Sequence, residues 1–379
     1  MRMLESKSFL TSVERNPLLR LVLRETFYKQ FCAGANKAEV QATMKKLHNI
    51  GYNGIILEYA LEVLREAKDA DEIEDVEVWR KGMLDSITVA NPGDFIGLKW
   101  SGMGPHALER MKAHKPPTER MESAMREVCD LAAAKGVALL PSAEETNTAP
   151  AYHEWTMNLQ RKYNKERSRP VLYNTYQLYL RGMPAELSKH LTSAKRDGHV
   201  LGVKLVRGAY LSSEPKHLLW PTAEATHAAY DSVAEAVLKR QYGGLVQPVH
   251  GDGSEGFPEV DLVLATHNAV SVRKAQALRT EQVQQGVERI PLSYAQLQGM
   301  ADEVSCELIQ ASKASNSDKK IVEVPRVFKC TTWGTMTQCL NYLLRRAAEN
   351  KDAASRTRES RVAMGKEMRR RLMALFGLA

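Results

Sequence analysis

The sequence has little of what marks disulfide-rich, membrane-spanning or metal-binding proteins. Its 379 residues include five cysteines, an odd number, without a CxxC pair or a Cys/His cluster. Such scattered cysteines favour reduced thiols in an intracellular compartment. No apolar run is long enough to span a bilayer, and the histidines show no metal-ligand spacing. We therefore expect no structural disulfide, no membrane span and no bound metal.

The start of the chain also lacks a recognisable targeting signal. Residues 1–20 have no apolar core of the secretory type, and Glu5 and Glu14 are unusual in a mitochondrial presequence. These residues alone predict a cytoplasmic location.

The chain is basic, with a formal net charge of +8, but no nucleic-acid-binding motif accompanies that charge. Most basic residues alternate with acidic ones, so we expect no nucleic-acid partner. The densest basic stretch is the predicted C-terminal helix at 351–379, where Arg369, Arg370 and Arg371 precede an apolar ending. Two interpretations remain open: this helix docks on the body of the protein, or it makes a peripheral membrane contact.

Residues 1–50 show helical spacing, and after Gly51 short apolar runs alternate with longer helical segments. The predicted strands are Gly54–Glu58, Phe95–Lys99, Val137–Leu140, Val171–Thr175, Val200–Val206, Leu262–Ala265, Ile290–Tyr294 and Val324–Cys330. Eight such units without hairpin signals predict a closed TIM-type (βα)8 barrel over 51–350. A Rossmann fold is disfavoured because GxGxxG is missing. Two stretches, Glu66–Glu77 and Gly243–Pro258, read as surface insertions.

Unusual polar residues occur near the carboxyl ends of the predicted strands, where barrel enzymes carry their chemistry. They include Lys99, Ser142, Gln177, Lys204, Tyr210, Thr266, His267 and Asn268. One such residue could be a salt bridge or a loop cap, but the repetition indicates a site.

The last helix of the barrel is sharply two-sided. Tyr342, Arg345, Arg346 and Glu349 share one face, and leucines and alanines share the other. The polar face could be solvated and held by ordinary helix ion pairs. Alternatively, the paired arginines form a forked clamp for a carboxylate.

Several ordered motifs resemble the proline dehydrogenase family in its fungal and other eukaryotic form. They are YNTYQ at 173–177, GVKLVRGAY at 202–210, LATHN at 264–268, LQGMAD at 297–302 and YLLRRAAEN at 342–350. The resemblance begins at NPLL from Asn16 and FYKQFCAG at 27–34, so it covers nearly the whole chain.

The resemblance implies a flavin-bearing barrel whose eighth helix lies over the mouth. The residues that it implies for the substrate are Lys99, Arg345, Arg346, Tyr210, Leu297, Tyr342, Cys330 and Glu349. Those that it implies for FAD are Gln177, Lys204, Val206, Gly208, Ala209, Thr266, His267 and Asn268. Lys99, Lys204, Tyr210 and Ser142 are the expected catalytic group.

The activity implied is oxidation of L-proline to 1-pyrroline-5-carboxylate, by hydride transfer to flavin N5 and electron transfer to a quinone-type acceptor. The amine must be unprotonated to donate its lone pair as the carbon–nitrogen double bond forms. The resemblance also implies a mitochondrial location, which the start of this chain does not support.

Two positions depart from the family pattern. Ser142 stands where typical members have an acidic residue, so Lys99 lacks an expected ion-pair partner unless Glu144 or Glu145 substitutes. Cys330 stands where many members place a tyrosine against the substrate ring. The smaller cysteine makes 4-hydroxyproline, or another substituted cyclic imino acid, an alternative substrate. A catalytically weakened flavin-binding or ligand-binding barrel is the second alternative.

Overall fold

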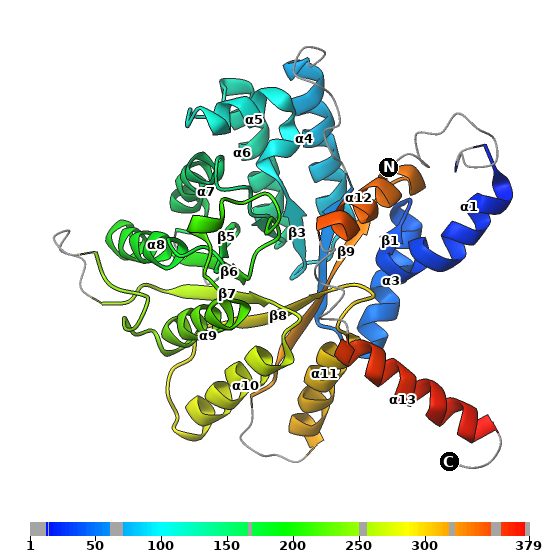
Figure 1. The fold of residues 1–379 in the computed structure, drawn as a ribbon. Coiled ribbons are helices and arrows are strands. Elements are labelled where there is room, and N and C mark those ends of the chain that lie inside the picture. The colour runs from blue at the N-terminus through cyan, green and yellow to red at the C-terminus, as the bar shows by residue number, and fades with distance from the viewer. Residues whose placement is uncertain are drawn as a thin grey trace.

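The computed structural model describes residues 13, 15–60, 71–165, 169–249, 256–317, 323–349 and 358–375. Within these ranges eight parallel strands form the central sheet, and at least one helix follows each of them (Figure 1). The strands are β2 (Gly54–Tyr59), β3 (Phe95–Leu98), β4 (Ala138–Pro141), β5 (Tyr173–Gln177), β6 (Leu201–Val206), β7 (Val260–Ala265), β8 (Leu292–Leu297) and β9 (Arg326–Trp333).

The sheet closes on itself. Its order is β4-β3-β2-β9-β8-β7-β6-β5, so the first and last of the eight strands are neighbours. β2 and β9 pair from Gly54↔Phe328 to Tyr59↔Trp333. β4 and β5 meet through one parallel bridge between Leu139 and Leu172. The predicted TIM-type barrel is therefore confirmed, with this bridge as its thinnest seam.

The barrel helices that follow the strands have clear sequence punctuation. They are α4 (Glu72–Val89), α5 (Pro105–Lys112), α6 (Glu119–Lys135), α7 (Ala149–Tyr163), α8 (Met183–Asp197), α9 (Ala223–Lys239), α10 (Ala269–Gln284), α11 (Asp302–Ser317) and α12 (Met336–Glu349). The Thr118 hydroxyl caps α6 by accepting from the amide of Met121, and Gly136 ends it with φ of 69°. A polar N-cap and a left-handed glycine satisfy backbone groups that the helix leaves free.

Further helices precede and follow the barrel. The N-terminal ones are α1 (Pro17–Leu23), the π-helical turn η1 (Arg24–Tyr28), α2 (Lys29–Phe31) and α3 (Lys37–Ile50). Short 3-10 turns η3 (Trp100–Met103) and η4 (Lys216–Leu218) lie in loops, and α13 (Arg358–Leu375) projects from the body beside α11 (Figure 1). None of the described helices is both long and apolar enough to cross a membrane.

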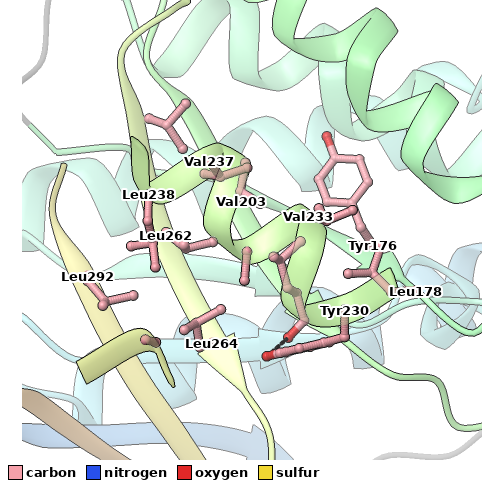
Figure 2. Close-up of a cluster of buried hydrophobic side chains, with 14 of the residues drawn as sticks. Tyr176, Leu178, Val203, Tyr230, Val233, Val237, Leu238, Leu262, Leu264 and Leu292 are labelled. Atoms are coloured by element: carbon pink, nitrogen blue, oxygen red, sulfur yellow. Dashed lines mark hydrogen bonds between the residues drawn. The ribbon is translucent and has the colours of Figure 1, made fainter. Parts of the chain in front are cut away.

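The apolar core is divided between the barrel interior and the shell between strands and helices. The interior cluster consists of Ile56, Phe95, Ala138, Leu140, Tyr173, Val263, Ala295 and Phe328. Figure 2 shows part of the shell, where Val203 and Leu264 of the strands pack near Tyr230 and Val233 of α9. These layers fill the barrel with side chains, as a TIM-type core requires.

Two expectations about the chain were wrong. Residues 1–50 are not helical throughout, because β1 (Cys32–Gly34) pairs in parallel with the end of β9. Residues 72–77 belong to α4 and are not a surface insertion. Asp71 caps that helix, and Glu72, Glu74 and Asp75 occupy its first turn, where the helix dipole favours negative charge.

Candidate active site

The alternation of each strand determines which polar residues face the barrel interior. Lys204 is in register with Val263, which belongs to the interior cluster, and Cys330 is in register with Ile56 of that cluster. Register partners in a parallel sheet point to the same face. Lys204 and Cys330 therefore point inward, beside residues of the apolar layer.

Lys99 and Tyr210 meet at the barrel mouth, although they are far apart in the sequence. The Lys99 Nζ donates to the Tyr210 hydroxyl at 2.8 Å, and that hydroxyl donates to the carbonyl of Ala143 at 3.0 Å. The ammonium also lies 5.4 Å from the centre of the Tyr210 ring. The loop after β6 is thereby tied to the residues that follow β3 and β4.

Glu58, at the end of β2, is a mouth residue that the sequence analysis missed. Its Oε2 accepts from the Tyr342 hydroxyl at 2.6 Å, and its Oε1 lies 3.4 Å from the Ser142 hydroxyl. A signal was present: Glu58 follows Ile56 by two residues, so it occupies an inward position at the carboxyl end of a strand.

Glu144, considered above as a substitute carboxylate, is used elsewhere. Its Oε1 accepts from the Ser101 hydroxyl at 2.7 Å. Its carbonyl accepts from Gln177 Nε2 at 2.9 Å, and the Oε1 of that glutamine accepts from the Ala209 amide at 3.3 Å. Gln177 therefore joins the loops that follow β4 and β6.

Gly208 fixes the shape of the loop that carries Tyr210. Its φ is 144°, and a Cβ placed there would lie 2.3 Å from ring carbons of Tyr179. Any larger residue would be strained at this φ and would force this loop or the Tyr179 ring to move.

Arg207 is a second residue to which the sequence analysis gave no role. Its guanidinium donates to Thr266 at 2.7 Å and to Ser271 at 2.8 Å, and it lies 4.3 Å from the centre of the Tyr230 ring. The Thr266 hydroxyl also accepts from the Asn268 amide at 3.1 Å. Asn268 caps α10 through the Ser271 amide at 3.0 Å. A cation, a hydroxyl and a helix N-terminus therefore lie together.

His267 and Leu297 connect the loops after β7 and β8. The His267 Nε2 accepts from the Leu297 amide at 3.1 Å. Burial, together with the nearby Lys329 ammonium, lowers the pKa of His267 to about 4, so the ring is neutral at pH 7. The buried Lys329 also donates to the carbonyls of Leu297 and Met300, which holds the LQGMAD loop in place.

Helix α12 carries the predicted clamp, but the side chains of Arg345, Arg346 and Glu349 lie outside the described residues. The backbone of α12 is described over its whole length, and Tyr342 on it contacts Glu58 at the mouth. The clamp therefore remains a prediction.

The fold and the mouth define a (βα)8 barrel protein with charged and polar side chains gathered at the carboxyl ends of its strands. A family model described as "Proline dehydrogenase" matches residues 40–359. The chain belongs to the proline dehydrogenase family.

Curated relatives include enzymes with two different named substrates. The chain is 27% identical to the "Probable proline dehydrogenase, mitochondrial" of Schizosaccharomyces pombe, over 92% of this chain and 80% of that protein. It is also 27% identical to the "Hydroxyproline dehydrogenase" of Bos taurus, over 93% of this chain and 82% of that protein. The chain spans 55% of the Caenorhabditis elegans "Proline dehydrogenase 1, mitochondrial", to which it is 28% identical.

Among solved structures, the chain resembles proline utilization A (PutA) from Bdellovibrio bacteriovorus, inactivated by N-propargylglycine. The TM-score is 0.65 at 16% identity, over 88% of this chain and 34% of that one. At this identity the likeness concerns the fold alone. The matched part is about a third of the larger protein.

Proposed function

We propose that this protein oxidises L-proline to 1-pyrroline-5-carboxylate with FAD as its cofactor. The observation that carries the proposal is the contact between Lys99 and Tyr210 at the barrel mouth, 2.8 Å between Nζ and the hydroxyl. It places a cation beside an aromatic ring, which suits a small cyclic amino acid with one carboxylate. Arg345 and Arg346 on α12 complete the proposed carboxylate clamp.

The donor set that follows β6 and β7 fits a flavin dinucleotide. Arg207, Thr266 and the N-terminus of α10 supply the positive potential and donors that suit a diphosphate. Lys204 is buried and points inward, where a cation stabilises negative charge on a ring system. Gln177, Val206, Gly208, Ala209, His267 and Asn268 complete the proposed cofactor residues.

When bound, FAD supplies a hydride acceptor at N5. The residues of this chain bind and orient the substrate. Lys99 and the arginines hold the carboxylate, and Tyr210, Leu297 and Tyr342 wall the ring. The ring carbon next to nitrogen, opposite the carboxylate-bearing carbon, then faces the cofactor.

Flavin bleaching tests the proposal directly. The purified protein should show flavin absorption, and anaerobic addition of L-proline should bleach it, whereas D-proline should leave it unchanged. Bound flavin that neither L-proline nor trans-4-hydroxy-L-proline bleaches would instead support the weakened, ligand-binding alternative that Ser142 suggests. Absence of any flavin after supplementation with FAD would contradict the proposed oxidation of L-proline.

Cys330 favours 4-hydroxyproline as a second candidate substrate. Its half-buried thiol points into the barrel beside Leu297, its register partner, and leaves more room than a larger side chain would. The bovine hydroxyproline dehydrogenase and the S. pombe proline dehydrogenase each share 27% identity with this chain.

Enlarging Cys330 should therefore discriminate between the two substrates. We expect Cys330→Tyr to lower kcat/KM for trans-4-hydroxy-L-proline relative to L-proline by about tenfold, because a filled pocket rejects a substituent. Steady-state kinetics on both substrates measure this ratio. Cys306→Tyr, at an exposed cysteine of α11, is the matched control and should leave the ratio unchanged. Equal effects of the two substitutions would contradict a ring-facing role for Cys330.

The proposed electron acceptor and cellular location follow from the family. A quinone-type molecule accepts the electrons, and α13 makes a peripheral membrane contact near it. Val362, Met368 and Met373 are exposed on that helix, and its last turns carry three consecutive arginines at 369–371. We also propose a mitochondrial location, because the names of the S. pombe and C. elegans relatives include the word mitochondrial.

A further inference from the structure

The carboxylate of Glu58 joins three elements at the mouth of the barrel. Glu58 belongs to β2, Ser142 follows β4 directly, and Tyr342 lies on α12. Its two oxygens are 2.6 Å from the Tyr342 hydroxyl and 3.4 Å from the Ser142 hydroxyl. An ionised carboxylate accepts from hydroxyl donors more strongly than a neutral group does.

Gly97 makes this reach across the sheet feasible. β3 lies between β2 and β4, and Gly97 is the register partner of Glu58 on β3. A Cβ at Gly97 would lie 2.4 Å from Glu58 Cγ and 2.8 Å from its Oε1. The glutamate side chain therefore occupies the space that any larger residue on β3 would fill, and so extends toward Ser142.

We infer that Glu58 is a positioning residue of the proposed active site. The Glu58 carboxylate holds α12 against the barrel mouth through Tyr342, an inference that rests on the proposed function. Arg345 and Arg346 follow Tyr342 by about one helical turn, so anchoring this residue orients the segment that carries the clamp.

The same geometry explains why a serine, and not an acidic residue, stands at position 142. A hydroxyl at this position can donate to Glu58, whereas an acidic side chain would bring a second negative charge close to the first. Two adjacent carboxylates cannot both ionise without a large energetic penalty. At this place in the mouth the carboxylate is therefore supplied by Glu58 of β2, and the residue after β4 supplies a hydroxyl.

Removing the charge of Glu58 should loosen α12 and weaken substrate binding. We expect Glu58→Gln to raise the KM for L-proline by about five- to tenfold while kcat changes by less than about twofold, because the carboxylate touches a binding element and not the reacting atoms. Glu58→Asp should give a similar loss, since it keeps the charge but not the reach across Gly97. The matched control is Glu109→Gln, at an exposed glutamate of α5, which should leave KM unchanged.

A double-mutant cycle with Ser142→Asp gives the sharpest test. In the wild-type background Ser142→Asp should raise KM about tenfold through like-charge repulsion. In the Glu58→Gln background Ser142→Asp should lower KM, because it restores one carboxylate beside position 58 at the barrel mouth. The reversal of sign supports the inference. The same effect of Ser142→Asp in both backgrounds overturns it.

A second measurement separates this inference from the proposed function. Amide hydrogen exchange across residues 336–344 of the full chain should be at least about fivefold faster in Glu58→Gln than in the wild type, and unchanged in Glu109→Gln. Failure of L-proline to bleach the wild-type flavin would refute the proposed function, yet faster exchange would still support the anchoring of α12. Unchanged exchange in Glu58→Gln overturns the anchoring itself.

Discussion

Replacing Lys99 with methionine is expected to lower kcat/KM for L-proline by about 30- to 150-fold. The estimate takes about 2–3 kcal/mol for a lost hydrogen bond from a charged donor, with a factor of ten for every 1.4 kcal/mol or so. Methionine retains the unbranched, apolar stem of lysine and removes the ammonium, which donates to Tyr210 at 2.8 Å. Most of the loss should be in KM if the ammonium binds the substrate carboxylate equally in the ground and transition states.

The control for this prediction is Lys112→Met, at an exposed lysine of α5. It makes the same chemical change away from the mouth and should leave kcat/KM within about twofold. Circular dichroism and flavin content should match the wild type in both variants. A loss in Lys99→Met that is no greater than in the control would exclude Lys99 from substrate binding.

Replacing Phe328 with alanine should lower the free energy of unfolding by about 3–5 kcal/mol, as for other buried aromatic side chains. Phe328 is 2% exposed and lies in the barrel interior, with its ring centre 5.0 Å from that of Phe95. The surrounding strands form a closed ring, so they have little freedom to collapse into the cavity.

Urea denaturation followed by circular dichroism measures this change. Phe27→Ala is the matched control, because the side chain of Phe27 is 56% exposed and its loss should alter the free energy of unfolding by less than about 0.5 kcal/mol. Similar values for the two variants would show that the barrel interior repacks around the missing ring.

The periodicity of the sequence was enough to predict the barrel, because each strand carries its own apolar run. The eight predicted strands correspond to β2–β9, with boundaries that differ by a few residues; the last runs to Trp333 where Cys330 was expected. β1 was missed because its three residues have no apolar run and depend on pairing with β9, which is distant in the sequence.

The site was predicted unevenly for a similar reason. Lys99, Tyr210 and Ser142 stand out as polar residues after strands, and the structure brings them to one mouth. Glu58 was overlooked because it reads as the polar end of an apolar strand. Its significance depends on Gly97 of the neighbouring strand and on Tyr342 of α12, which only the folded arrangement brings together.

The pairing of β2 with β9 has a consequence for biosynthesis. Synthesis of the interval from Tyr59 to Trp333 takes on the order of 15 to 55 s at about 5–20 residues per second, and until it ends β2 lacks its partner β9. An unpaired strand edge is a template for pairing with other chains. Nascent or prematurely terminated forms that stop before Arg326 therefore present this edge to chaperones, proteases and one another.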